Sequence, residues 1–126
     1  TGCAMKLFMF EQFKRIWQRA IWSWTGFVHV YQTEHSLKQW LVGNVFFAIL
    51  AFILPLDAAT RGMLLMGGVF VLAMECVNTA IERVVDDISL EKRDLAKHAK
   101  DCGSAAVAVT SIGVGIGWAA ALIGLM

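Results

Sequence analysis

The 126-residue sequence is poor in charged residues and in proline. Asp, Glu, Lys and Arg together make up 17% of it, against about 25% in an average soluble domain, and the chain has one proline. Low charge with almost no proline excludes an intrinsically disordered protein. The 11 Lys and Arg residues are balanced by 10 Asp and Glu residues, which leaves a net charge of +1. Because no basic excess is available to bind nucleic-acid phosphates, we expect no nucleic-acid partner.

Cysteine is also scarce, with three residues that form no C-x-x-C pair. Cys3, Cys76 and Cys102 are far apart in the chain and have no histidine at zinc-finger spacing, so we expect reduced thiols and no zinc site. No apolar signal segment precedes Cys3. Residues 1–4 stand ahead of Met5, and we expect them to be a remnant of cloning, with residues 5–126 forming a single membrane domain.

Hydrophobic residues, at 58%, dominate what the chain does contain. A bilayer span needs about 20 mostly apolar residues, and two uncharged runs meet this requirement, at about 39–56 and 102–125. A helical pattern over about 59–88 supplies a third span. At 1.5 Å per residue this third range would be ~45 Å long, so one end must project beyond the ~30 Å hydrocarbon core. The sequence predicts an all-α membrane protein with three transmembrane helices.

The distribution of lysine and arginine predicts how these spans are oriented. Five precede the first span and five lie in the second loop, whereas the first loop has only Arg61 and the C-terminal tail has none. By the positive-inside rule the N-terminus and the second loop are cytoplasmic, and the C-terminus is periplasmic. We therefore expect a multi-pass protein of the bacterial inner membrane.

The segment of about residues 6–25 has the pattern of an amphipathic interfacial helix. Charged and amide side chains lie opposite a face of apolar residues at helical spacing, made up of Phe10, Phe13, Ile16, Trp17, Ala20 and Trp24. A helix of this kind lies on the membrane surface instead of crossing it. In the last span, Gly113, Gly117 and Ala121 form a face of small residues that would let another helix approach closely.

A stripe of polar residues follows one face of the middle span. Glu75, Thr79, Glu82 and Asp86 are spaced i, i+4, i+7 and i+11, with Asn78 beside them. Carboxylates cost several kcal/mol to hold near lipid, so they normally face a bundle interior, a metal or a substrate path. Lys97, Lys100, Asp101 and Ser104 share a face at the start of the last span, and Glu34 precedes the first. Oxygen ligands of this kind suit Mg²⁺, and magnesium with a lysine suits phosphate.

Two motifs are similar to those of a known family. The run from Glu75 to Asp86 reads E-x-x-N-T-A-I-E-x-x-V-D, and Ala99-Lys100-Asp101 follows in the next span. Both resemble the prokaryotic diacylglycerol kinases, small integral-membrane lipid kinases. The resemblance implies a homotrimeric helix bundle that transfers the γ-phosphoryl group of MgATP to the hydroxyl of diacylglycerol, giving phosphatidic acid at the cytoplasmic leaflet.

The resemblance also implies roles for individual residues. Glu75 matches the general base and also contacts the lipid substrate, Asn78 supports the site, and Glu34 and Glu82 match the ligands of Mg²⁺. Gln39 and Ser104 match residues on the substrate side. ATP contacts are implied for a larger set: Arg15, Trp22, Glu34, Glu82, Glu91, Lys92, Arg93, Lys100 and Asp101.

Two alternatives remain open from the sequence. The Gly-Ser-Ala-Ala run after Asp101 resembles the Gram-negative diacylglycerol kinases, but undecaprenol kinases belong to the same family and are the nearest alternative. An ion or proton pathway is the main alternative of another class, because intramembrane carboxylates also mark such pathways. Against a pathway, the outer half of every expected span is apolar.

Overall fold

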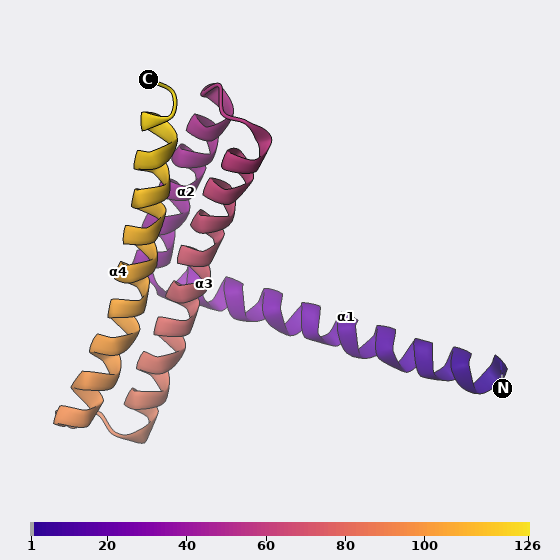
Figure 1. Ribbon diagram of the computed structural model, residues 1–126. Coiled ribbons are helices and arrows are strands. Elements are labelled where there is room, and N and C mark those ends of the chain that lie inside the picture. Colours follow the sequence, from indigo (N-terminus) through magenta and orange to yellow (C-terminus); the bar gives the residue numbers. More distant parts are fainter. Residues whose placement is uncertain (1) are drawn as a thin grey trace. The chain divides into compact units, whose positions relative to one another are not determined.

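The computed structural model describes residues 2–126, without the side chain of Cys3, and the described chain consists of α-helices and short connections (Figure 1). Thr1, part of the expected cloning remnant, lies outside the described residues. The helices are α1 (Gly2–Thr33), α2 (His35–Ile53), α3 (Ala58–Ile88) and α4 (Asp94–Ile123). Helix α1 forms one compact unit, and Glu34–Met126 form a second unit of three helices. The all-α prediction is confirmed.

Helices α2, α3 and α4 are each long and apolar enough to cross a membrane. Their 19, 31 and 30 residues correspond to the three spans expected at about 39–56, 59–88 and 102–125. The prediction of three spanning helices is confirmed by this length and composition. Helix α4 begins at Asp94, well before the uncharged run, so its first turns hold the charged residues that precede the apolar segment.

A tight connection joins α2 to α3. Helix α2 stops before Pro55, because the ring of a proline disfavours helical backbone in the preceding residue, and Leu54 is extended (φ −73°, ψ 145°). Asp57 caps α3 by accepting hydrogen bonds from the Thr60 hydroxyl (2.7 Å) and the Thr60 backbone N–H (2.9 Å). Both bonds lower the pKa of Asp57 below its usual value, and the bond from the Thr60 hydroxyl has the larger effect.

Arg61 closes the same connection. Its guanidinium donates to the Ala51 carbonyl (Nε, 2.8 Å) and to the Leu56 carbonyl (Nη2, 3.0 Å), and it lies 5.3 Å from the centre of the Phe52 ring. The helix end leaves carbonyl groups without helical partners, and Arg61 satisfies one of them. This arginine therefore has a structural role at the end of the unit opposite to the α3–α4 connection.

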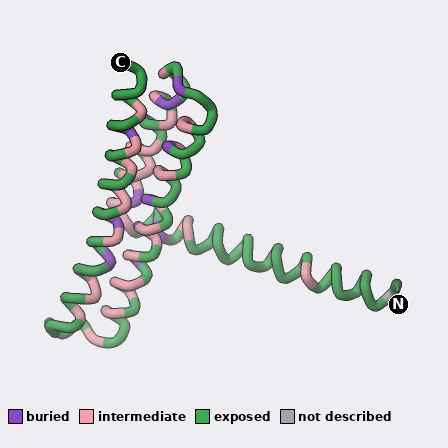
Figure 2. The backbone as a smooth tube through the Cα atoms, in the orientation of Figure 1, coloured by how far each residue is buried: buried purple, intermediate pink, exposed green. Residues whose placement is uncertain are grey.

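Helix α3 is the centre of the three-helix unit and packs against both α2 and α4. A buried core of Ala51, Leu56, Leu64 and Trp118 joins all three helices near the α2–α3 connection. Close approach of α2 needs glycine at Gly68, where an added Cβ would lie 2.0 Å from Asn44 Oδ1. Much of the unit's surface is exposed (Figure 2), and many of its exposed side chains are large and hydrophobic, which suits lipid contact.

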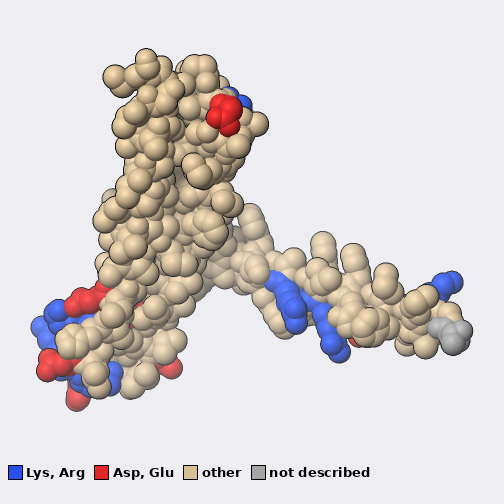
Figure 3. Space-filling view, viewed as in Figure 1, with Lys and Arg blue, Asp and Glu red and all other residues tan. Residues whose placement is uncertain are grey.

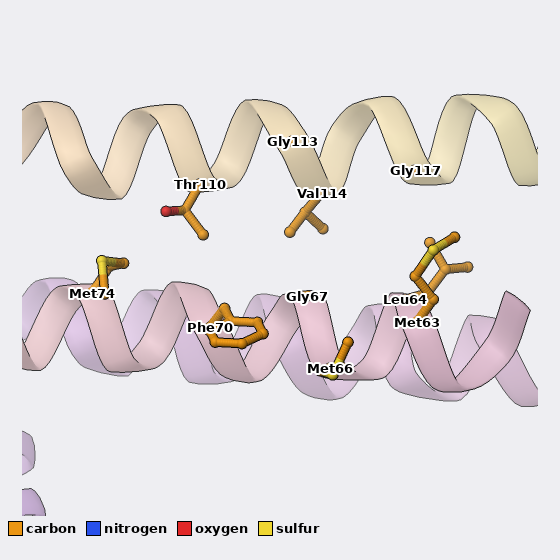
Figure 4. A pocket seen from close by; sticks show the side chains of 10 residues that line it. All are labelled: Met63, Leu64, Met66, Gly67, Phe70, Met74, Thr110, Gly113, Val114 and Gly117. Carbon is orange, nitrogen blue, oxygen red and sulfur yellow. The ribbon is translucent and has the colours of Figure 1, made fainter. Parts of the chain in front are cut away.

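The face of small residues on α4 only partly matches the close approach that the sequence suggested. A Cβ on Gly117 would lie 3.5 Å from Leu64 Cδ2, an ordinary contact, whereas one on Gly113 would meet nothing within 4 Å. Both glycines line a cavity of about 440 Å³ between α3 and α4, where Thr110 and Val114 face Met74 and Phe70 across the gap (Figure 4).

Helix α1 is longer than the expected surface helix of about 6–25, because it begins at Gly2 and continues through Gly26 to Thr33. The aromatic residues of its expected apolar face, among them Phe13, Trp17 and Trp24, are exposed. A position in the membrane interface stays a prediction for this helix.

Candidate active site

The expected base, metal ligands and substrate-side serine lie around one cavity of about 340 Å³ in the three-helix unit. It is lined at the start of α2 by Glu34, Ser36 and Trp40, on α3 by Glu75, Asn78, Thr79 and Glu82, and on α4 by Ser104, Val107 and Ala108. We call this the carboxylate cavity. Its α3 residues share a face because they recur every three or four residues.

Glu75 and Thr79 are the buried polar residues of the unit, with 5% and 2% of their surface exposed. Within the described residues, the Glu75 carboxylate has no hydrogen bond or ion pair. An unpartnered carboxylate in an apolar helix is costly and is normally retained for function. Its free oxygens, at the wall of a cavity, are suited to accept a proton from a bound molecule.

Asn78 orients Glu82. The amide Nδ2 donates to Glu82 Oε1 at 3.1 Å, while Asn78 Oδ1 is buried with no hydrogen-bond partner. That oxygen faces Gly103 of α4, where an added Cβ would lie only 2.4 Å away. Sequence reasoning did not assign a role to Gly103, although it directly precedes Ser104 in the quoted motif region. Its missing side chain is what allows α4 to pack against the Asn78 amide.

Glu34 is held by an arginine that sequence reasoning counted only as a cytoplasmic charge. Glu34 is the N-cap residue of α2, with extended backbone (φ −110°, ψ 122°) and no side-chain capping bond. Its Oε1 accepts from Arg83 Nη2 at 3.2 Å, and the two side chains are 31% and 38% exposed, respectively. This ion pair links α2 to the α3 turn that also holds Glu82.

A second cavity, of about 420 Å³, lies where α3 connects to α4. It contains five of the expected ATP contacts, namely Glu91, Lys92, Arg93, Lys100 and Asp101. Lys100 Nζ lies 2.6 Å from Asp86 Oδ1, and Lys97 Nζ lies 2.6 Å from Asp101 Oδ2. We call this the lysine cavity. Charged side chains gather at this end of the unit, and the opposite end shows one small charged group (Figure 3).

Lys100 is held by an acidic residue of α3. Its partner is Asp86, one helical turn beyond Glu82 toward the α3–α4 connection. Gln39 is exposed on α2 and lines neither cavity. Arg15 and Trp22 are exposed residues of α1, which is a separate unit.

The carboxylate cavity fits a particular kind of magnesium site. Among the described residues there is no cluster of three or more His, Cys, Asp or Glu side chains that could hold a metal ion. Glu34 and Glu82 supply two carboxylates to one cavity. Mg²⁺ commonly uses one or two carboxylates and completes its shell with waters and substrate phosphates. The residues present therefore suit a cation that arrives with a nucleotide, and they do not form an all-protein cage.

Sequence comparison relates this chain to lipid kinases. Residues 21–122 match the family model of prokaryotic diacylglycerol kinase. The protein named diacylglycerol kinase in Pseudomonas aeruginosa is 35% identical to this chain, over 88% of this chain and 90% of that protein. The protein of the same name in Escherichia coli strain K12 is 38% identical, over 84% of this chain and 87% of that protein. The protein of that name in Helicobacter pylori strain 26695 is 32% identical over 75% of this chain and 73% of its own. The matched range includes both cavities.

Proposed function

Since the chain belongs to the prokaryotic diacylglycerol kinase family and is a kinase, we propose that it transfers the γ-phosphoryl group of ATP to the hydroxyl of diacylglycerol. The products are ADP and phosphatidic acid, and the reaction takes place at the cytoplasmic leaflet of the bacterial inner membrane. The observation that carries this proposal is the buried, unpartnered Glu75 carboxylate at the wall of a cavity that also holds Glu34 and Glu82.

Glu75 is the proposed general base. The hydroxyl oxygen of diacylglycerol forms the new bond to the γ-phosphorus, the bond from that phosphorus to the ADP oxygen breaks, and the hydroxyl proton passes to the Glu75 carboxylate. Ser104, in the same cavity, is placed to hydrogen-bond the headgroup. Glu75 lies seven residues from Glu82 on α3, which is ~10 Å along the helix. That separation suits a lipid hydroxyl reaching inward from the interface and a nucleotide arriving from water.

The nucleotide end of the site is proposed to extend into the lysine cavity. Lys100 would donate to a phosphate oxygen, where its positive charge counts most as negative charge spreads over the transferring group. Glu91, Lys92, Arg93 and Asp101 line the same cavity and are proposed as further ATP contacts. Because Lys100 is paired with Asp86, nucleotide binding must share or exchange that ion pair.

Glu34 and Glu82 are the residues proposed to hold Mg²⁺. When bound, the cation supplies positive charge against the phosphate oxygens. Asn78 keeps the Glu82 carboxylate oriented through its 3.1 Å hydrogen bond.

The proposal includes three further parts. Arg15 and Trp22 contact the nucleotide from α1, and Gln39 contacts the lipid substrate. The chain acts as a homotrimer, an assembly consistent with the many exposed apolar side chains of the helices. Its N-terminus and α3–α4 connection face the cytoplasm and its C-terminus faces the periplasm, as the gathered basic residues favour.

A product assay tests this function. The purified protein, in mixed lipid and detergent micelles with Mg²⁺ and γ-labelled ATP, is given diacylglycerol or undecaprenol. We expect the label in phosphatidic acid. Label only in undecaprenyl phosphate would identify the other lipid as substrate. If neither lipid is labelled, the protein is not a kinase of this type, and ion flux in vesicles then tests the pathway alternative.

A further inference from the structure

Glu34 lies at a helix junction where the local backbone does not hold its side chain in one conformation. It lies between the end of α1 at Thr33 and the start of α2 at His35, on extended backbone. The usual contact of an N-cap side chain is with a backbone N–H of the first helical turn, and Glu34 makes no such bond. A long, one-third exposed glutamate at such a junction has many rotamers available to it unless another group holds it.

Arg83 is the group that holds it. Its Nη2 lies 3.2 Å from Glu34 Oε1, a contact that joins residues 49 apart in sequence. Arg83 is the immediate neighbour of Glu82 on α3, so one segment of that helix presents one expected metal ligand and tethers the other. Asn78 orients Glu82, a residue of the same helix, through a hydrogen bond. Arg83 orients Glu34 from a different helix, because Arg83 belongs to α3 and Glu34 precedes α2.

We propose that Arg83 is a positioning residue for the proposed metal site: it keeps the Glu34 carboxylate at the wall of the carboxylate cavity, which Glu82 also lines, before MgATP binds. This inference rests on the proposed function. It assigns no contact between Arg83 and the substrates, because Arg83 lines neither cavity.

Arg83 has two opposite effects on cation binding, because it holds a ligand in place but its positive charge also repels the cation. The Arg83 side chain is 38% exposed, and water and salt screen its repulsion of a nearby ion. Loss of the Arg83–Glu34 ion pair, by contrast, frees the Glu34 carboxylate, because Glu34 has no other side-chain partner among the described residues. Removing Arg83 therefore weakens cation binding, and the size should match that of a partly exposed ion pair, about fivefold, or ~1 kcal/mol.

The test uses three variants of the full-length protein. Arg83→Met keeps the length and apolar stem of the side chain but removes its charge and donors, and Arg83→Lys restores the charge. Arg61→Ala is the matched control, since it removes an arginine of the same helix from the opposite end, where the guanidinium donates to two backbone carbonyl groups and lies near the Phe52 ring. Mn²⁺ binding is measured by electron paramagnetic resonance with a non-hydrolysable ATP analogue, and KM for MgATP and kcat are measured separately.

In Arg83→Met we expect the Kd for Mn²⁺ and the KM for MgATP each to rise about fivefold, with kcat changed less than twofold. Arg83→Lys should recover at least half of the loss. Arg61→Ala should lower the melting temperature and leave Mn²⁺ binding unchanged. If Arg83→Met does not fold, Arg83→Gln takes its place, with the same expectations.

Unchanged Mn²⁺ binding in the neutral variant would overturn the inference, and so would tighter binding, which would show that Arg83 competes with the cation. A loss that Arg61→Ala shares equally would reduce Arg83 to a general structural role and would also overturn it. Failure of the proposed function is a separate result, because the wild-type protein itself would then phosphorylate no lipid.

Discussion

Replacement of Gly103 by alanine adds one methyl group at the contact between α4 and the Asn78 amide. The new Cβ would lie 2.4 Å from Asn78 Oδ1 and 3.4 Å from Asn78 Cγ. A comfortable carbon–oxygen contact is ~3.4 Å, so the amide or the α4 backbone must move by about 1 Å. The Asn78–Glu82 hydrogen bond is already 3.1 Å long, and a shift of this size would break it.

The cost should appear in activity more than in stability. A hydrogen bond to a charged group contributes about 1.5–3 kcal/mol, which corresponds to a fall in kcat/KM for MgATP of about 13- to 160-fold if Glu82 loses its orientation. Alanine gains ~1 kcal/mol over glycine in a helix interior, and this gain offsets part of the packing cost in the folded protein. We expect a melting temperature within a few degrees of wild type, together with the loss of activity.

Gly113→Ala is the matched control, because it makes the same substitution on the same helix where an added Cβ meets nothing within 4 Å. It should leave kcat/KM unchanged. Steady-state kinetics on purified protein of matched oligomeric size measure both variants. Near-normal activity of Gly103→Ala, or an equal loss in Gly113→Ala, would refute the argument that Gly103 positions Glu82 through Asn78.

The remaining predictions concern the two ends of the three-helix unit. Lys100→Met should lower kcat/KM for ATP by about 30- to 150-fold, the ~2–3 kcal/mol expected for one preorganised charged donor, and Lys100→Arg should recover only part. If kcat/KM for ATP of purified Lys100→Met falls less than threefold, Lys100 does not contact phosphate and serves only to anchor the helix at the membrane interface. At the other end, folding lowers the pKa of Asp57 below its ordinary value of 3.8. The ionised cap therefore stabilises the folded protein fully above pH 3.8, and this stabilisation is lost as the pH falls through the lower pKa of the folded state. The difference in melting temperature between wild type and Asp57→Ala should therefore shrink below about pH 3.8, and a difference that persists unchanged there would contradict the role of the ionised cap.

Helical periodicity was sufficient to predict the α3 part of the carboxylate cavity. Glu75, Asn78, Thr79 and Glu82 recur at three- and four-residue spacing within one helix, so their common face follows from helix geometry alone. The three spans were predictable for a similar reason, since the bilayer sets the length of an apolar helix. The length of α1 was not, because the amphipathic pattern ends near Trp24 while the helix continues to Thr33.

The sequence did not predict which side chains of different helices contact one another. The pairing of Glu34 with Arg83, and of Lys100 with Asp86, depends on how far each helix is displaced along its neighbour. Gly103 gave no signal by itself, since its importance comes from the Asn78 side chain of another helix. The positions of Glu34 and Lys100 in the sequence, and the family resemblance, made both residues candidates without indicating their partners.

The most direct test of the account is the rate of phosphoryl transfer to diacylglycerol by Glu75→Gln, with nucleotide binding measured on the same sample. Asp87→Asn is the control, because Asp87 is an exposed carboxylate of the same helix that lines neither cavity. Glutamine keeps the volume of Glu75 but cannot accept the hydroxyl proton, so turnover should fall at least ~100-fold while MgATP binding stays within about twofold and Asp87→Asn retains full activity. Turnover by Glu75→Gln within tenfold of wild type would contradict the assignment of Glu75 as the general base.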